Sequence, residues 1–380
     1  MRNEVETAPI ELNQPSEADL AALPDIAAVF VLRAGERSAY AARTTALRRR
    51  VRRAVKLLGL GDVLTSIEYW PVASALEGSL LHYAVMRRVF PEQYLKLIRL
   101  RMPAYVKVTL GNAFPRTHVS ARLSSKALHY GPFRSRAEAE NFESQFLDFF
   151  QLRRCQEDLA PSPVHPGCIY GEMNMCLRPC QQVVSVEEYR SEARRVVDFL
   201  STNGASLLAS ATAARDRLSE EMNFEEAARQ HQRSERINAV LALRGELVRD
   251  VDRLCGVVVT PALSVAAPCS SALCAPALCA QTVNLHFVWR GAWIGPVPFA
   301  VEQMGSSLDQ RLREIVDGIE TPRISVQERQ EHLALLARWY YSSWREGDWI
   351  AIDDPARVPY RRIVRAVSKV LGGGAGRALK

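Results

Sequence analysis

Four cysteines in one short segment constrain this chain more than any other sequence feature. Cys155, Cys168, Cys176 and Cys180 are spaced C-x12-C-x7-C-x3-C, in a stretch rich in Pro and Gly and poor in periodicity. Four thiolates so placed can enclose a metal ion or an iron–sulfur cluster. The spacing matches no common zinc finger, and thiolates suit zinc and iron–sulfur clusters alike. Zinc, a cluster and four unlinked buried cysteines therefore all stay open.

The start of the sequence favours a reducing compartment. Residues 1–22 are polar and acidic and lack the apolar core of a signal peptide. No apolar run approaches the roughly 20 residues that span a bilayer. We therefore expect a soluble, cytoplasmic protein with no membrane partner, whose eight cysteines favour metal or redox chemistry over disulfides. The remaining four make a weaker candidate for a second metal site: Cys255, Cys269, Cys274 and Cys279.

A basic stretch follows the first apolar run. The chain carries 49 basic and 42 acidic residues, a formal net charge of +7, and many of the cations crowd this stretch. They are Arg33, Arg37, Arg43, Arg48, Arg49, Arg50, Arg52, Arg53 and Lys56. Such a block predicts a phosphate-facing surface, with a solvated helix face as the alternative.

Apolar periodicity predicts an α+β fold. Strands are expected at 28–32, 38–41, 104–109, around 119, at 283–289 and at 293–299. Helices are expected from a Thr44 or Thr45 cap to 58, and at 74–89, 135–150, 186–247 with a break at 201–204, 307–316 and 326–343. Residues 131–133 are interpreted as a turn.

These elements predict five parts. A polar leader (1–22) precedes a small mixed domain (23–125), a cysteine-rich segment (126–184) and a helical region (185–250). A smaller α+β region (251–380) follows, with a low-complexity loop at 260–281 and a flexible tail from Gly372.

The order of these segments resembles the N-terminal half of the UvrC family of excinucleases. Ala28-Val29-Phe30 and Tyr40-Ala41-Ala42 stand where that family has its GIY and YIG strands, and 47–51 matches its basic helix. Strand 105–109, Phe114-Pro115-Arg116, Tyr130-Gly131-Pro132-Phe133 and the cysteine region continue the match to about residue 250. The resemblance implies a [4Fe–4S] cluster on the four cysteines.

The segment Met222-Asn223-Phe224-Glu225-Glu226-Ala227-Ala228 resembles the UVR motif, a helical hairpin through which UvrB and UvrC associate. Phe224, Ala227 and Ala228 fall on one helical face, where small alanines let a second helix approach. Met222, Phe224, Glu225, Ala227 and Ala228 are therefore the expected partner-binding residues. His231 and Gln232 replace the family's Arg-Asp pair, and an intramolecular hairpin is the alternative.

A GIY-YIG nuclease needs a tyrosine, an arginine and a glutamate that holds a divalent metal. Tyr40 and Arg50 match the tyrosine and arginine, and Arg43 replaces the usual lysine. Phe30 and Ala54 replace two further tyrosines.

The metal-binding glutamate is the decisive position. An ungapped match places His82 there, and a lone imidazole is a poor ligand for Mg²⁺. A gapped register would instead use Glu77, roughly 500° earlier around the helix. We therefore expect a degenerate site, with Mg²⁺ or Mn²⁺ needed only if it still acts.

The last part of the chain offers no replacement nuclease. No segment resembles the family's ribonuclease-H-like catalytic core, and the adjacent Asp353 and Asp354 favour a solvated turn. The aromatic cluster Trp339, Tyr340, Tyr341, Trp344 and Trp349, with Arg345, favours core over a base-stacking surface.

These observations predict a UvrC-like protein of nucleotide excision repair that binds DNA and, through the hairpin, UvrB and with it UvrA. Its expected DNA-binding residues are Arg48, Arg49, Arg52, Arg53, Lys107 and Arg116. Two alternatives stay open. One is an active, metal-dependent endonuclease that makes a single cut, and the other is an iron–sulfur, redox-responsive regulator.

Overall fold

The computed structural model describes residues 8–35, 37–61, 63–263, 282–301, 308–320 and 322–374. Most of the low-complexity loop, with Cys269, Cys274 and Cys279, lies outside the described residues, as do the first seven residues and the end of the tail. The α+β class is confirmed: three four-stranded antiparallel sheets are combined with helices. No helix of the described part is long and apolar enough to cross a membrane.

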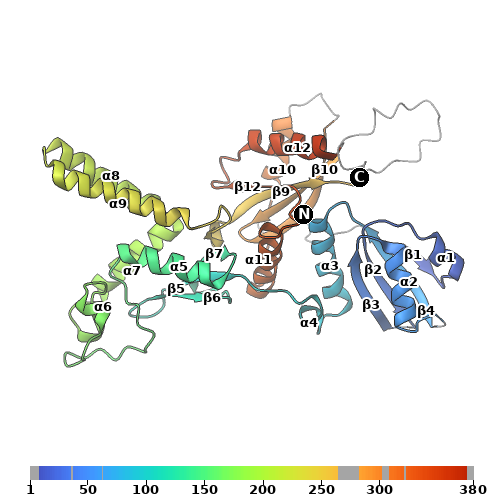
Figure 1. Ribbon diagram of the computed structural model, residues 1–380, viewed down its shortest axis with the longest axis horizontal. Helices are drawn as coiled ribbons and strands as arrows, with labels where there is room; N and C mark the ends of the chain where they lie inside the picture. The colour runs from blue at the N-terminus through green and yellow to red at the C-terminus, as the bar shows by residue number, and fades with distance from the viewer. Residues whose placement is uncertain are drawn as a thin grey trace.

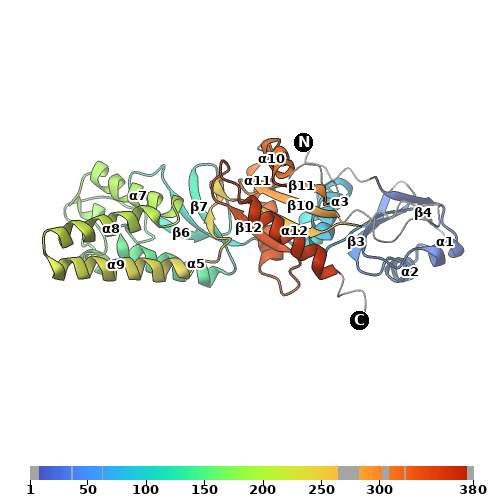
Figure 2. The same cartoon turned by 90° about the horizontal axis from the view of Figure 1, so that it is seen from above.

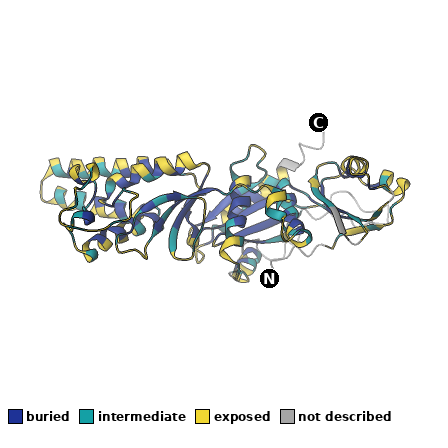
Figure 3. Cartoon of the chain, turned by 90° about the horizontal axis from the view of Figure 1, so that it is seen from below, coloured by how far each residue is buried: buried dark blue, intermediate teal, exposed yellow. Residues whose placement is uncertain are grey.

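The three sheets lie in a row, and the last in sequence is in the middle (Figures 1 and 2). The first sheet forms one end, and the long pair of helices α8 and α9 projects from the other. Figure 3 shows that the central strands are buried, whereas the outward faces of the projecting helices are exposed.

The first sheet has the order β1-β4-β2-β3. Its strands are β1 (Ile10–Asn13), β2 (Ala28–Ala34), β3 (Arg37–Thr44) and β4 (Leu64–Pro71), and the helices of this part are α1 (Glu17–Ala22), α2 (Leu47–Leu57) and α3 (Ala75–Val89). The predicted hairpin is confirmed, since β2 and β3 pair antiparallel. The expected threonine cap is wrong: Ala46 is the N-cap of α2, and the hydroxyl of Thr44 accepts from the amide of Ala46.

Each face of this sheet has its own apolar cluster. Phe30 and Leu32 pack with Leu47 and Val51 of α2 on one face. Val29 and Val31 pack with Leu81 and Val85 of α3 on the other. Alternation along a strand produces this division, because successive side chains point to opposite faces.

The middle sheet has the order β6-β5-β7-β8. A short helix, α4 (Tyr94–Ile98), leads into β5 (Ala104–Thr109), β6 (Thr117–Ser120), β7 (Ala127–Phe133) and β8 (Arg249–Asp250). The turn expected at 131–133 is wrong, because these residues end β7. Pro132 lies at the register shift between β7 and β5, where its missing N–H interrupts no regular ladder.

Helices cover one face of the middle sheet and continue into the hairpin. They are α5 (Arg136–Phe146), η1 (Leu147–Phe149), α6 (Ile169–Glu172), η2 (Pro179–Gln181), α7 (Val186–Ser201), α8 (Ala205–Glu220) and α9 (Phe224–Ala242). Phe142, Phe146 and Phe199 are fully buried against this face. The predicted helical break at 201–204 is confirmed, and a second break separates α8 from α9.

The C-terminal sheet has the order β11-β10-β9-β12. After η3 (Val251–Arg253) come β9 (Cys255–Pro261), β10 (Thr282–Trp289), β11 (Ala292–Ala300) and β12 (Asp348–Ile352), with α10 (Leu308–Asp317), α11 (Val326–Tyr340) and α12 (Tyr360–Gly374). Ile363 and Val367 of α12 and Leu312 of α10 pack on one face of this sheet.

The other face of the C-terminal sheet packs into a core shared by all three parts. Leu76 of α3 and Tyr105 of β5 join Leu333, Leu336 and Trp339 of α11 there. The core interpretation of the aromatic cluster is confirmed for Trp339 and Trp349, which are 1% and 3% exposed, whereas Trp344 keeps 37% exposure. Burying a large side chain contributes about 1.5–3 kcal/mol, so this shared core holds the three parts together.

Candidate nucleic-acid interface and cysteine site

The tyrosine and arginine predicted for a nuclease site lie side by side. Arg50 Nη2 of α2 donates to Tyr40 Oη of β3 at 2.6 Å, and the guanidinium lies 5.9 Å from the ring centroid. Phe30, which stands in place of a tyrosine, packs 5.9 Å from the Tyr40 ring. Within the described residues, no carboxylate pairs with Tyr40 or Arg50.

Arg43 and His82 belong to the opposite face of the sheet. Ala41 packs in the α3-side cluster, and Arg43, two residues further along β3, points the same way. Arg43 Nη1 donates to Ser79 Oγ of α3 at 2.6 Å. The positive charges of Arg43 and Arg338 both act on the His82 imidazole. The structure therefore separates Arg43 and His82 from the Tyr40–Arg50 pair.

Glu77 is engaged at the start of α3. Its amide donates to the Ser74 hydroxyl at 3.1 Å, and its carboxylate accepts from the amide of Ala73 at 2.8 Å. Burial raises the pKa of this carboxyl above its usual range. Helix α3 runs without interruption from Ala75 to Val89, so Glu77 acts as a capping residue in this structure.

The His82 imidazole is held neutral. Burial first, and then the charges of Arg43 and Arg338, lower its pKa to about 4. Burial and the charge of Arg338 also lower the pKa of Arg43. A position beside two cations repels a divalent metal, so this arrangement lacks the carboxylate that the nuclease chemistry needs.

Helix α2 presents the predicted basic surface. Leu47, Val51, Ala54 and Val55 are buried against the sheet. The outward positions are exposed cations: Arg48, Arg49, Arg50, Arg52, Arg53 and Lys56. Apart from the bond between Arg50 and Tyr40, none of them has an ion pair or side-chain hydrogen bond within the described part of the chain.

Lys107 and Arg116 lie in the middle sheet, away from α2 (Figure 1). Lys107 stands opposite His118 and His129 on the neighbouring strands. Burial, followed by the charges of Arg116 and Lys107, lowers the pKa of His118. The six predicted DNA-binding residues thus form two groups on different sheets.

The four cysteines of the central segment are close enough for their charges to interact. All four are free thiols. Burial raises the pKa of Cys176 to about 11, and the charges of Cys155, Cys168 and Cys180 raise it further, against a backbone N–H from Arg178. Four thiolates can share this segment only if a cation offsets their charge, which matches the donor chemistry of zinc or an iron–sulfur cluster.

A buried arginine orders the entrance to this segment. Arg153 is 6% exposed, and its guanidinium donates to the carbonyls of Phe114 and Glu157 at 3.1 and 2.9 Å. The same side chain reaches Cys155 Sγ at 3.7 Å. As the side chains stand, no three His, Cys, Asp or Glu residues of the described ranges are arranged to hold a single metal ion.

Comparison with known proteins identifies this middle part. Residues 104–199 match the family model described as UvrC/Cho excinuclease, middle domain. The chain is UvrC-like. The match runs from β5 to α7, so it contains all four cysteines of the central segment.

Curated relatives extend the similarity. UvrABC system protein C of Rickettsia prowazekii (strain Madrid E) is 28% identical over 189 residues, 49% of this chain and 30% of that protein. UvrABC system protein C of Ruminiclostridium cellulolyticum is 23% identical over 372 residues, 93% of this chain and 58% of that protein. The chain thus spans between a third and three fifths of the length of these UvrC proteins. No solved structure matches it.

The UVR-like segment forms the tip of the projecting hairpin. Met222 and Phe224 are 78% and 66% exposed there, and Glu225 and Ala228 are also exposed. Ala227 is buried, on the side that packs against α8. The alanine face therefore closes the intramolecular hairpin through Ala227, and the exposed apolar residues stand beyond it.

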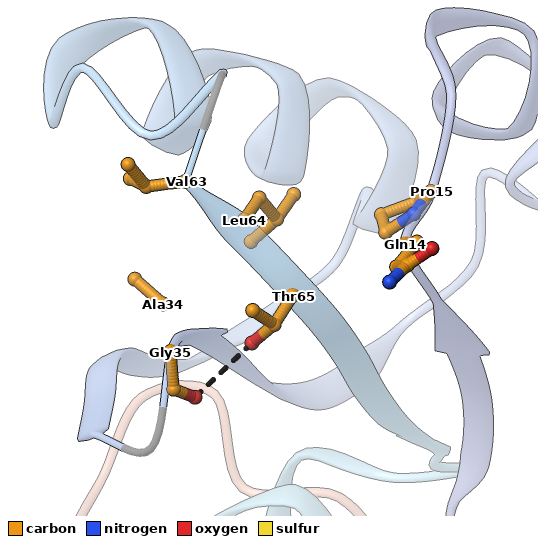
Figure 4. A pocket seen from close by; sticks show the side chains of 7 residues that line it. All are labelled: Gln14, Pro15, Ala34, Gly35, Val63, Leu64 and Thr65. Carbon is orange, nitrogen blue, oxygen red and sulfur yellow. Dashed lines mark hydrogen bonds between the residues drawn. The ribbon is translucent and has the colours of Figure 1, made fainter.

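Two depressions lie elsewhere on the described surface. One is found where β1, β2 and β4 meet, lined by Gln14, Pro15, Ala34, Gly35, Val63, Leu64 and Thr65 (Figure 4). It contains no charged residue. A smaller, polar one joins the end of α7 to Arg249, Asp250, Arg253 and Asp353. Asp353 pairs there with Arg249 at 2.7 Å, and Asp354 accepts from the Ala356 amide, as expected of a turn.

Sequence reasoning missed three residues around Arg43 and His82. Arg338 acts on both by its charge, and Trp344 lies under the Arg43 guanidinium at 5.8 Å. Glu346 accepts from the amide of Ala75 at 3.2 Å. No sequence signal links these C-terminal residues to α3, because the contact depends on how two distant helices pack.

Proposed function

We propose that this chain is a UvrC-like protein of bacterial nucleotide excision repair that binds DNA through α2 and does not cut it. The observation that carries this proposal is the exposed cationic face of α2 beside a Tyr40–Arg50 pair that has no carboxylate partner among the described residues. A surface of uncompensated arginines attracts the phosphate backbone. The missing carboxylate removes the metal on which cleavage would depend.

The similarity to UvrC proteins supports the repair context, and a cytoplasmic location is part of the proposal. We further propose that the exposed tip of the hairpin, with Met222 and Phe224, docks UvrB and through it UvrA. Exposed apolar side chains at the end of a projecting element suit a protein partner.

We also propose that Cys155, Cys168, Cys176 and Cys180 hold a [4Fe–4S] cluster. When bound, the cluster would supply positive charge that keeps the thiolates ionised and orders the segment. Anaerobically purified protein should then show visible absorbance together with iron and sulfide, and Cys168→Ser should lose both. Colourless protein with one zinc would favour zinc instead.

The DNA-binding proposal is tested by the salt dependence of affinity. Replacing Arg48, Arg49, Arg52 and Arg53 by Gln should weaken binding to a labelled duplex and flatten the plot of log affinity against log salt. Each lost phosphate contact lowers the slope by about 0.9.

A matched control replaces four exposed arginines outside this helix, namely Arg190, Arg217, Arg229 and Arg236. It makes the same change in net charge and should leave the slope nearly unchanged. Equal effects of both sets would contradict a specific role of α2.

A further inference from the structure

Helix α11 carries a stripe of residues that faces α3. Glu328 pairs with Arg87, and Glu331 accepts from the Tyr83 hydroxyl at 2.6 Å. Both pairs join the second half of α3 to the first half of α11 (Figures 1 and 2). Positions 328, 331, 335 and 338 recur at helical spacing, so the stripe continues to Arg338.

The two helices run antiparallel along this contact. Position 87 meets 328 and position 83 meets 331, so the first turns of α3 lie opposite the end of α11. Glu346, shortly after α11, accepts from the Ala75 amide, which fixes the same alignment from the other side. Arg338 therefore arrives beside the turn of α3 that carries Ser79 and His82.

Three groups that are cationic or can become so meet there, which we call the junction cluster: Arg43, His82 and Arg338. Arg43 uses only Nη1 for hydrogen bonds, to Ser79 Oγ and the Ala75 carbonyl. Arg338 has neither a hydrogen bond nor an ion pair among the described residues. The charges that shift the pKa of Arg43 and His82 are all positive.

An aromatic face adjoins the cluster. Trp344 lies 5.8 Å from the Arg43 guanidinium and is 37% exposed. Arg345, by contrast, stacks on Trp339 and Tyr340 at 5.1 and 4.4 Å, with Trp339 fully buried. Neighbouring residues of one loop thus serve different surfaces, and only Trp344 is available beside the cluster.

We propose that Arg43, His82 and Arg338 form a phosphate-binding site shared by the first and C-terminal parts of the chain, with Trp344 as a stacking surface for an adjoining base. This inference rests on the proposed DNA binding. A group of like charges with free N–H donors is stabilised by an anion, and guanidinium forks match the oxygens of a phosphate. The neutral imidazole of His82 adds one N–H donor, and an exposed indole accepts a base of an unpaired strand.

The replacement of a metal-binding glutamate by His82 then has a positive meaning. A carboxylate here would pair with Arg43 and Arg338 and repel phosphate, whereas a neutral imidazole leaves both arginines for an anion. The position that would hold a metal in a nuclease serves, in this chain, to hold the strand itself.

The first test measures the affinity of a labelled single-stranded oligonucleotide as a function of salt. Arg338→Gln should weaken binding several-fold and lower the salt slope by about 1, the value for one lost phosphate contact. Arg338→Lys should restore the slope, and His82→Glu should lower it as Arg338→Gln does. Arg345→Gln is the matched control and should change neither quantity.

A second readout follows Trp344 directly. Quenching of tryptophan fluorescence by the oligonucleotide should be smaller in Trp344→Leu than in wild-type protein. Unchanged slope in Arg338→Gln and unchanged quenching in Trp344→Leu would overturn the site.

Inorganic phosphate separates the two sources of the same chemistry. If phosphate raises the thermal midpoint of wild-type protein but not of Arg338→Gln, while the oligonucleotide slope stays constant, the site takes free phosphate and the strand assignment is overturned. Loss of affinity in the α2 variant but not in Arg338→Gln would overturn this inference and leave the proposed function standing. The reverse result would overturn the role of α2 and leave the junction cluster.

Discussion

At the residue scale, spacing predicted some contacts and could not reach others. Tyr40 and Arg50 are joined because β3 and α2 are consecutive and their short connection fixes the two side chains. Glu77 could be a ligand or a cap on sequence alone, and its bond to the Ala73 amide makes it a cap in the folded chain. Arg338 was beyond sequence reasoning, since only the packing of α11 on α3 brings it to His82.

Buried histidines should make the protein acid-labile. His332 accepts from the Trp293 amide at 3.1 Å, and burial lowers its pKa from 6.5 to about 4. The unfolded chain therefore takes up this proton first, so stability is full above about pH 6.5 and is lost as pH falls toward 4. The thermal midpoint should fall over this range. His332→Asn should show a smaller fall, and an equal fall would contradict this assignment.

A buried carboxylate should hold α3 and α4 to α11. Glu331 is 1% exposed and accepts from the hydroxyls of Tyr83 and Tyr94. Glu331→Ala leaves two hydroxyls unpaired in the core and should lower the free energy of unfolding by about 3 kcal/mol. Tyr83→Phe, which removes one bond, should cost about 1 kcal/mol. Denaturant unfolding measures both, with the exposed pair member Arg136→Ala as a near-neutral control.

At the scale of elements, periodicity located most helices and strands, and the errors have local causes. The helices 74–89 and 186–201 and the strand pair 283–289 and 293–299 lie where predicted. β7 was taken for a turn because Gly131-Pro132 is typical of one, yet both residues end a strand. β12 and α12 were not predicted. β12 is only five residues long, and its burial comes from pairing with β9 rather than from its own pattern.

The entry to β12 should be intolerant of any side chain. Gly347 has φ +77°, and a Cβ there would overlap the carbonyl oxygen of Val259 in β9. A left-handed backbone costs a non-glycine residue roughly 1–2 kcal/mol before this overlap is counted. Gly347→Ala should therefore lower the thermal midpoint clearly, whereas Gly111→Ala, with open space around its Cα, should not. A stable Gly347→Ala variant would contradict this packing.

At the scale of the whole molecule, the order of parts in space could not be predicted. The chain places its last sheet between the first two, and α11 contacts both α3 and the middle sheet (Figures 1 and 2). Sequence patterns report local periodicity, and they do not show which finished faces pack together. The shared core around Leu76, Tyr105 and Trp339 thus explains both the rigidity of the row and the origin of the junction cluster.

The central claim is that this fold binds DNA without cutting it. The most direct measurement follows binding and incision on one lesion-bearing duplex, using anaerobically purified protein with Mg²⁺ or Mn²⁺, in the presence and absence of UvrA and UvrB. We expect DNA that is bound, in a manner that salt weakens steeply, and that stays intact. Metal-dependent incision that disappears in Arg50→Ala would contradict the account and show that the Tyr40–Arg50 pair still serves a working nuclease.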